Sequence, residues 1–336
     1  METTNLIPAI IPSSVEVANP EVITTSYPQV ITQNKNPSFL EGPSTAISLK
    51  DLTEKSIVPF YKDGESISHQ AFITTVMEAA KIVWGDVSEP QIRVSHLIRG
   101  KKNEAIGKST LSDNEFSQYY ERMAFKCEIS NIKGFISGQD LTLSIAGVRS
   151  YYGSRFHSKK PAEKFSICVG HTVFCCDNQC IRTDGTKIGI QCYDIASLFK
   201  EAITLFMGFN IEKSLLSFDS LQNAVLSESQ FCSVLGRMRL LNAMSPSEQK
   251  KHPAILMGDS QMNAVARLAL QEDNPFRANP VDGSISLWNF HNLLTESIKS
   301  SYIDLALPRF ANATDLSVGL ASALDGMDQT DDWFLN

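Results

Sequence analysis

The spacing of apolar residues changes near Asp194, and this change restricts the fold more than any other feature of the chain. Upstream, most apolar residues alternate with polar ones or form short runs typical of strands, whereas downstream they recur at i, i+3 and i+4, which is typical of helices. Strands that precede helices along a chain indicate an α+β protein. We therefore predict a mainly antiparallel, sheet-rich half over 61–193 and a helical region over 194–324 that packs on it.

Cap residues and local patterns place the individual elements. Ser66 and Ser68 are suitable N-caps for a helix that Gly85 ends. Runs of β-branched and aromatic residues predict strands over 92–98, 123–129, 141–148, 165–174 and 187–190. A short helix is predicted over 115–120, and later helices over 194–206, 215–226, 228–241, 260–270 and 287–306. The alternation over 141–145 predicts a sheet with one solvated face.

Proline is concentrated in the first 60 residues. Seven of the 14 prolines lie there, among Ser, Thr, Asn and short aliphatic pairs such as Ile10-Ile11. Because proline lacks a backbone N–H and disfavours both helix and sheet, residues 1–60 are predicted to form a flexible, extended arm. The aliphatic pairs could still add to a sheet edge or to a partner.

Basic residues are concentrated in the middle of an acidic chain. The protein has a net charge of −7, whereas residues 91–164 contain 13 Lys and Arg against 7 Asp and Glu. Such a segment is typical of a surface that binds a polyanion, although a solvated, lysine-rich face has the same composition. DNA, single-stranded or duplex, is therefore the first candidate partner.

The residues expected to contact DNA lie in or beside this basic segment. The predicted phosphate contacts are Lys101, Lys102, Lys108, Arg149, Arg155, Lys159 and Lys160. The predicted stacking groups are Tyr151, Tyr152 and Phe156. The run Gly107-Lys108-Ser109-Thr110 looks like the end of a phosphate-binding loop, but position 102, where that loop needs glycine, is lysine. The common catalytic motifs do not occur, so no catalytic residue and no cofactor is predicted.

Five of the seven cysteines lie between Cys168 and Cys192, with His171 among them. This cluster could be a metal site, a redox device or a set of buried thiols. If 165–174 is a strand, Cys168 and His171 point to opposite faces and cannot bind one ion. Structural zinc also needs a second pair of closely spaced ligands, which the cluster lacks. Cys176 and Cys180 remain the candidate metal ligands, and a metal-dependent or thiol enzyme centred on His171 remains an alternative function.

The last dozen residues, 325–336, combine acidic side chains with aromatic ones. Acidic residues keep such a tail solvated, while aromatic residues can anchor it in the groove of a partner protein, as in the tails of single-stranded-DNA-binding proteins. The candidate partner-binding residues are Asp331, Asp332, Trp333 and Phe334. The other interpretation is that Trp333 and Phe334 fold back onto the core of this protein, because exposed aromatic surface is costly in water.

The composition does not indicate a membrane protein. No run of about 18 apolar residues occurs, and the first residues lack the basic and apolar regions of a secretory signal. We therefore expect a cytoplasmic location, where cysteines are normally thiols.

Six blocks of sequence, taken together, resemble an uncharacterised bacterial family known only as a domain of unknown function. The blocks are Arg93-Val94-Ser95-His96, Tyr119-Tyr120-Glu121-Arg122-Met123-Ala124-Phe125, Cys176-Asp177-Asn178-Gln179-Cys180 followed by Thr183-Asp184-Gly185, Leu256-Met257-Gly258-Asp259, Ser286-Leu287-Trp288-Asn289, and Lys299-Ser300-Ser301-Tyr302-Ile303-Asp304 leading to Arg309-Phe310-Ala311-Asn312-Ala313. The chain is more distantly similar to phage- and plasmid-like proteins of mobile elements.

The resemblance implies a bacterial protein associated with mobile elements, for which DNA handling is a common task. It supplies no catalytic residue, because the family has no established activity. Cys176, Asn178 and Cys180 match the family pattern. The pattern does not include Cys168, His171 or Cys175. The leading hypothesis is therefore a mobile-element protein that binds nucleic acid without catalysis.

Overall fold

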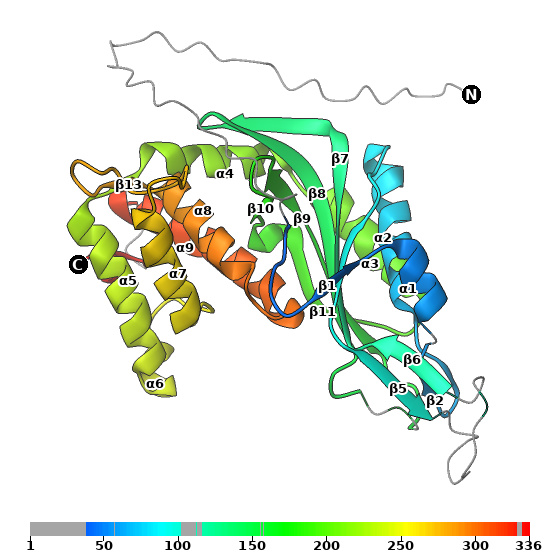
Figure 1. Ribbon diagram of the computed structural model, residues 1–336. Coiled ribbons are helices and arrows are strands. Elements are labelled where there is room, and N and C mark those ends of the chain that lie inside the picture. The colour runs from blue at the N-terminus through cyan, green and yellow to red at the C-terminus, as the bar shows by residue number, and fades with distance from the viewer. Residues whose placement is uncertain are drawn as a thin grey trace, which may run out of the picture. The chain divides into compact units, whose positions relative to one another are not determined.

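An antiparallel sheet of seven strands forms the centre of the protein (Figure 1). The computed structural model describes residues 38–56, 58–101, 112, 116–154, 156, 158–327 and 331–336. The strand order is β1 (Thr45–Ile47), β4 (Gln91–Val94), β7 (Arg122–Ile136), β8 (Gln139–Ser150), β9 (Glu163–Val173) and β10 (Asn178–Cys180), with β11 (Thr186–Cys192) also paired to β9. All these pairings are antiparallel, which confirms the predicted α+β class.

Three helices cover one face of the sheet. They are α1 (Leu49–Lys55), α2 (His69–Trp84) and α3 (Ile195–Gly208). The helix predicted to end at Gly85 is confirmed: the side chain of Ser68 accepts a hydrogen bond from the backbone N–H of Ala71, and Gly85 adopts a φ of 88°. Phe72 of α2 packs edge-on against Phe125 of β7, with ring centroids 5.4 Å apart.

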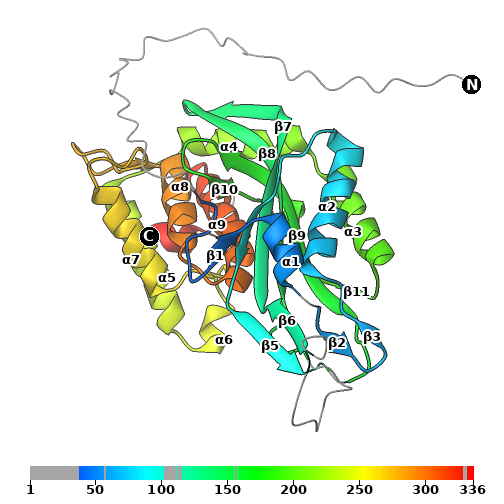
Figure 2. The same ribbon diagram turned by 45° about the vertical axis from the view of Figure 1, so that its right-hand side comes forward.

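The remaining helices lie on the opposite side of the sheet, at the left of Figure 1 and in the turned view of Figure 2. They are α4 (Ile211–Asn223), α5 (Glu228–Ala243), α6 (Pro246–Gln249), α7 (Asp259–Leu270), α8 (Leu287–Ile298), α9 (Ile303–Leu324) and α10 (Asp332–Leu335). The short pair β12 (Val225–Leu226) and β13 (Ile285–Ser286) lies among them. Helix α9 packs on β7 and β8, and Trp288 of α8 is fully buried in the core of this layer.

The prediction of one solvated sheet face is wrong, because helices cover both faces of the central strands. The polar positions of β8, Thr142 and Ser144, are buried, with exposed fractions of 8 % and 2 %. Small hydroxyl side chains tolerate burial when they are hydrogen-bonded, and the hydroxyl of Thr172 donates to that of Ser144 at 2.8 Å. Helix α3 lies beyond residue 193 but packs against α2, and the described residues from 38 onward belong to one compact unit.

Several predicted elements differ in the structure. Residues 115–120, predicted as a helix, contain the strand β6 (Phe116–Tyr120), and 92–98 contains parts of two strands, β4 and β5 (Leu97–Lys101). The predicted helix over 287–306 is divided into α8 and α9 at residues 299–302. Residues 38–60 are not uniformly extended as predicted, since they hold β1 and α1, whose N-cap is Ser48. The rest of the predicted arm, 1–37, lies outside the described residues.

Two further hairpin-like pairs and one short turn of helix complete the described fold. β2 (Phe60–Tyr61) pairs with β3 (Gly64–Glu65), β5 pairs with β6, and a 3-10 turn, η3 (Thr183–Gly185), precedes β11. Within the described ranges, no helix is both long enough and apolar enough to cross a membrane.

Candidate functional site

A two-stranded ribbon, β5 paired with β6, projects away from the central sheet at the lower right of Figure 1. The strands are antiparallel, with Leu97 opposite Tyr120 and Lys101 opposite Phe116. Arg99 is exposed, and its guanidinium lies over the ring of Phe116, 4.0 Å from the centroid. The outer part of the ribbon therefore joins a cation to an aromatic ring, an arrangement suited to contact with a nucleic acid.

An aromatic cluster fixes the base of this ribbon. The ring of Tyr119 lies 5.1 Å from that of Tyr151 and 5.5 Å from that of Phe156, and Phe156 also packs on Tyr61 at 5.2 Å. The edge-on geometry of the contacts made by Tyr119 is favourable between aromatic rings. Tyr151 is buried and Phe156 is half-buried, so both rings stabilise the ribbon and have little surface for stacking on bases.

Arg149 lies inside the protein beside this cluster. Its guanidinium forms an ion pair with Glu163 and donates to the hydroxyl of Ser66 at 3.1 Å, and the side chain is 2 % exposed. Lys160 is also close to Glu163, at 3.3 Å. Because the charge of Arg149 is neutralised internally, this residue does not belong to a surface that contacts phosphates.

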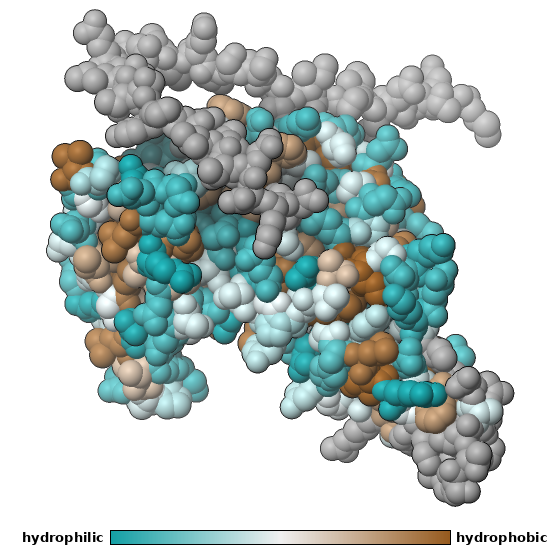
Figure 3. Space-filling view, viewed as in Figure 1, coloured by the Kyte–Doolittle hydropathy of each residue, from teal (hydrophilic) through white to brown (hydrophobic). Residues whose placement is uncertain are grey.

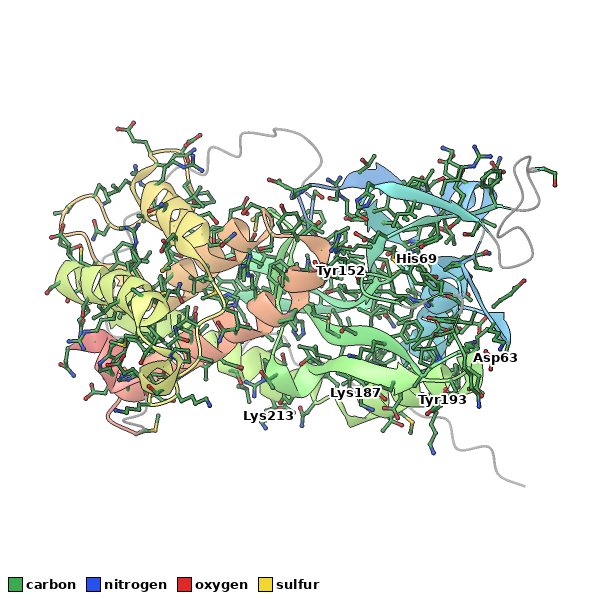
Figure 4. All side chains as sticks on the ribbon, turned by 90° about the horizontal axis from the view of Figure 1, so that it is seen from below. Asp63, His69, Tyr152, Lys187, Tyr193 and Lys213 are labelled. Carbon is green, nitrogen blue, oxygen red and sulfur yellow. The ribbon has the colours of Figure 1, made fainter. Side chains whose placement is uncertain are left out.

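Two of the predicted contact residues are exposed. Tyr152, labelled in Figure 4, has an exposed fraction of 70 %, and the guanidinium of Arg122 lies 4.9 Å from its ring centroid. Lys159 is exposed in the loop that follows, near Lys62 of the β2–β3 turn, since the N–H of Lys62 donates to Ser158 at 2.8 Å. Tyr152 thus lies beside Arg122, two residues after the end of β6.

The other predicted contacts cannot be placed as side chains. Lys102, Lys108 and Arg155 lie outside the described residues, as does the run 107–110 that looked like a phosphate-binding loop. Lys101 is described only by its backbone, at the end of β5. Arg99 was missed, although it belongs to the basic segment. Its spacing of two residues from Lys101, which places both on one face of a strand, was the signal that could have found it.

The surface is hollowed between the ribbon side and the opposite projection that ends at α6 (Figure 3). α6 is followed directly by Lys250 and Lys251, and both are exposed. Cations therefore occur on the two elements that border this hollow, although they come from distant parts of the sequence.

The cysteine cluster is divided among separate environments. Cys168 pairs with Ala146 across the strands, whereas His171 lies opposite Leu143 and Cys180. Burial raises the pKa of Cys168 to about 12 and lowers the pKa of His171 to about 4. A thiol that stays protonated is a poor nucleophile, and an imidazole with so low a pKa is a weak base, so the enzyme alternative centred on His171 gains no support.

Metal ligation by the candidate pair Cys176 and Cys180 also gains no support. Cys180 is fully buried, and burial raises the pKa of its thiol far above the ordinary value. Among the described residues, no three His, Cys, Asp or Glu side chains gather closely enough to hold a metal ion.

A buried polar seam joins the sheet to α8. Lys126 of β7, 1 % exposed, is paired with Asp177 and donates to Glu128 at 2.9 Å. Lys299, 2 % exposed, donates to Glu296 at 2.7 Å. The side-chain amide of Asn178, on β10, donates to the side-chain oxygen of Asn292, on α8, at 3.1 Å. This hydrogen bond connects the sheet with the helices.

The C-terminal residues pack on this protein rather than extending from it. Phe334 is fully buried, and α10 contacts α5 and α9. The ring of Trp333 stacks on His252 with centroids 4.0 Å apart, and Arg237 lies 5.0 Å from its centroid. Asp331 is buried and Asp332 begins α10, while 328–330 lie outside the described residues. The structure therefore agrees with the interpretation in which Trp333 and Phe334 fold back onto the core.

Replacing Trp333 with alanine is expected to lower the free energy of unfolding by about 1.5–2.5 kcal/mol, half the cost of removing a fully buried Trp. The loss follows from the contacts of the ring with His252 and Arg237. Urea denaturation measures it. Met327→Ala, at a 76 % exposed position near the tail, is the control and should change the free energy by less than about 0.5 kcal/mol. Equal stability of the two variants would show that the tail is not anchored.

The structure thus defines an α+β protein with a projecting basic ribbon, a buried polar seam and an anchored C-terminus. The chain belongs to the family described as "Domain of unknown function, B. Theta Gene description (DUF3871)", whose model matches residues 19–335. This confirms the predicted membership of an uncharacterised bacterial domain family. No curated protein and no solved structure matches the chain.

Proposed function

We propose that this protein binds duplex DNA through the β5–β6 ribbon, without catalysis, and that it serves a mobile genetic element. The observation that carries the proposal is the projection of a paired ribbon that presents Arg99 beside Phe116 and continues to Lys101. The major groove of B-DNA, about 12 Å wide, admits a two-stranded β-ribbon. A cation at the surface of such a ribbon can contact phosphates or the edges of guanine bases.

The distribution of charge supports the same surface. Several cations of the basic segment are neutralised inside the protein, as in the pairs of Arg149 with Glu163 and Lys126 with Asp177. Arg99 and Lys159 are exposed cations of the segment, and the sequence between β5 and β6 includes Lys102 and Lys108, which lie outside the described residues. The lysines after α6, across the hollow, would bring a second group of cations to a bound duplex.

The mobile-element part of the proposal is supported by the resemblance of the six sequence blocks to phage- and plasmid-like proteins. DNA handling is a common task of such proteins, which is the reason for naming DNA as the partner. The aromatic rings at the base of the ribbon are occupied by one another, and this favours contact with a duplex over stacking on separated bases.

The double variant R99Q/K101Q tests the proposal. Fluorescence anisotropy with a labelled duplex measures the affinity of the protein for DNA. The affinity of the unmodified protein should fall steeply as the salt concentration rises, and the variant should bind about tenfold more weakly at low salt. The slope of log affinity against log salt should fall by about 2, because two phosphate contacts are lost. A single strand of the same length should bind more weakly than the duplex.

The matched control is K200Q/R267Q, which removes the same two charges from exposed positions on α3 and α7. It should bind like the unmodified protein. An equal loss in both double variants would mean that only net charge matters, and absence of binding at low salt would refute the proposal. Thermal unfolding of each variant shows whether the fold is retained.

A further inference from the structure

The turn between β9 and β10 carries two adjacent cysteines in different environments. The thiol of Cys175 is exposed and lies 2.9 Å from the side-chain oxygen of Gln139, whereas Cys176 is half-buried. The ammonium group of Lys299, on the residue that caps α8, donates to the backbone carbonyl of Cys176. The two thiols therefore meet at the surface end of the buried polar seam.

The contacts of the pair make the two thiols chemically unequal. A hydrogen bond from the thiol of Cys176 holds the pKa of Cys175 below its ordinary value, and the positive charge of Lys299 acts in the same direction. The same hydrogen bond, together with burial, raises the pKa of Cys176. An exposed thiol with a lowered pKa, directly followed in the chain by a less exposed thiol with a raised pKa, is the arrangement of a nucleophilic and a resolving cysteine.

We infer that Cys175 and Cys176 form a modification site at which a hydroperoxide, with hydrogen peroxide as the simplest case, converts two thiols into one disulfide. The sulfur of Cys175 attacks one oxygen of the peroxide, the O–O bond breaks, and the hydroxide that leaves takes up a proton to become water. The sulfur of Cys176 then attacks the sulfenic acid on Cys175, forming the S–S bond, and the second water leaves with the proton of Cys176. The peroxide is reduced by two electrons, which come from the two thiols.

Such a disulfide is easily reduced, and its formation changes a contact of the buried polar seam. Consecutive Cα atoms are about 3.8 Å apart, closer than the separation of about 4.4 Å or more in ordinary disulfides, so the bond is strained and readily reduced. Closing the ring changes the backbone at Cys176, whose carbonyl accepts the hydrogen bond from Lys299. Oxidation at the surface would thereby loosen the contact between the β9–β10 turn and α8.

The test compares Cys175 with Cys232, an exposed cysteine on α5 that serves as an internal reference in the same molecule. Alkylation with iodoacetamide at pH 7, followed by mass spectrometry of peptides, should show that Cys175 reacts roughly fivefold faster or more than Cys232. Treatment with hydrogen peroxide should then remove two hydrogens from the peptide that contains both thiols, and dithiothreitol should restore them.

Two variants separate the steps. In C176S the sulfenic acid on Cys175 should persist and be trapped by dimedone, whereas C232S should form the disulfide as the unmodified protein does. Equal alkylation of Cys175 and Cys232 would overturn the inference. So would a peroxide product in which Cys175 is a sulfinic acid and Cys176 is still alkylated, or a disulfide that joins Cys175 to Cys180.

Discussion

The free energy of unfolding is expected to fall by about 5 kcal/mol when the pH is lowered from 7 to 5, because three histidines are buried without charge. His69, His171 and His291 have exposed fractions of 2 %, 0 % and 0 %. Burial, with a further contribution from Arg149 at His69, lowers their pKa values to about 3, 4 and 3 from an ordinary value of 6.5. In the unfolded chain the same side chains take up protons as the pH falls below 6.5.

The sign follows from proton binding. Between about pH 6.5 and pH 4 the unfolded state binds more protons than the folded state, so stability rises with pH in this range and is lost as the pH falls. Each histidine contributes a slope of about 1.4 kcal/mol per pH unit well below 6.5, and three together contribute about 4 kcal/mol per unit. Urea denaturation at half-unit steps from pH 7 to pH 5 measures the slope.

His171→Phe isolates one of the three contributions. His171 makes one long polar contact, 3.4 Å between its Nδ1 and the hydroxyl of Ser214, and the variant should lose about a third of the slope whatever its stability at pH 7. His96→Gln, at an exposed position, is the control and should keep the full slope. The same slope in all three proteins would mean that His171 is protonated in the folded state, contrary to its burial.

The parts of the fold that could be predicted from sequence are those with local signals. Helix α2 is an example, because Ser68 at its start and Gly85 at its end act on neighbouring backbone groups. The strand β6 was predicted as a helix, because its pairing with β5 depends on residues that are distant along the chain. Alternation in β8 could not reveal that a second helical layer covers Thr142 and Ser144, since that layer comes from the end of the chain.

The candidate site depends even more than the fold on contacts between residues that are distant along the chain. By residue type, Arg149 and Lys126 look like surface cations, and only the fold reveals that Glu163 and Asp177 neutralise them. Asp177 lies 51 residues after Lys126 in the chain, so no local pattern relates the two. The exposed cation Arg99 lies in β5, whose end was predicted three residues too early. Charge composition could identify the basic segment, but the exposed part of it depends on long-range pairing.

The buried pair of Lys126 and Asp177 provides the second large effect. Replacing Lys126 with methionine is expected to lower the free energy of unfolding at pH 7 by about 3–5 kcal/mol, because Asp177 would keep its charge in the interior without a partner. Burial already raises the pKa of Asp177, despite the opposing effect of Lys126, so its carboxylate is costly even in the pair. The loss should therefore be smaller at pH 5, where the carboxyl group can take up a proton.

A second substitution separates the charge from the packing. In K126M/D177N the interior charge is removed, and asparagine accepts the positive φ of 61° at position 177 more readily than most residues, so most of the lost stability should return. Lys133→Met changes an exposed lysine on the same strand and should alter the free energy by less than about 0.5 kcal/mol. Urea denaturation of the four proteins decides the matter. If K126M/D177N is as unstable as K126M, the loss comes from the lysine's packing and not from an unpaired carboxylate. A stable double variant would instead show that the charges are dispensable for stability, and that the joint between the sheet and α8 tolerates a neutral pair.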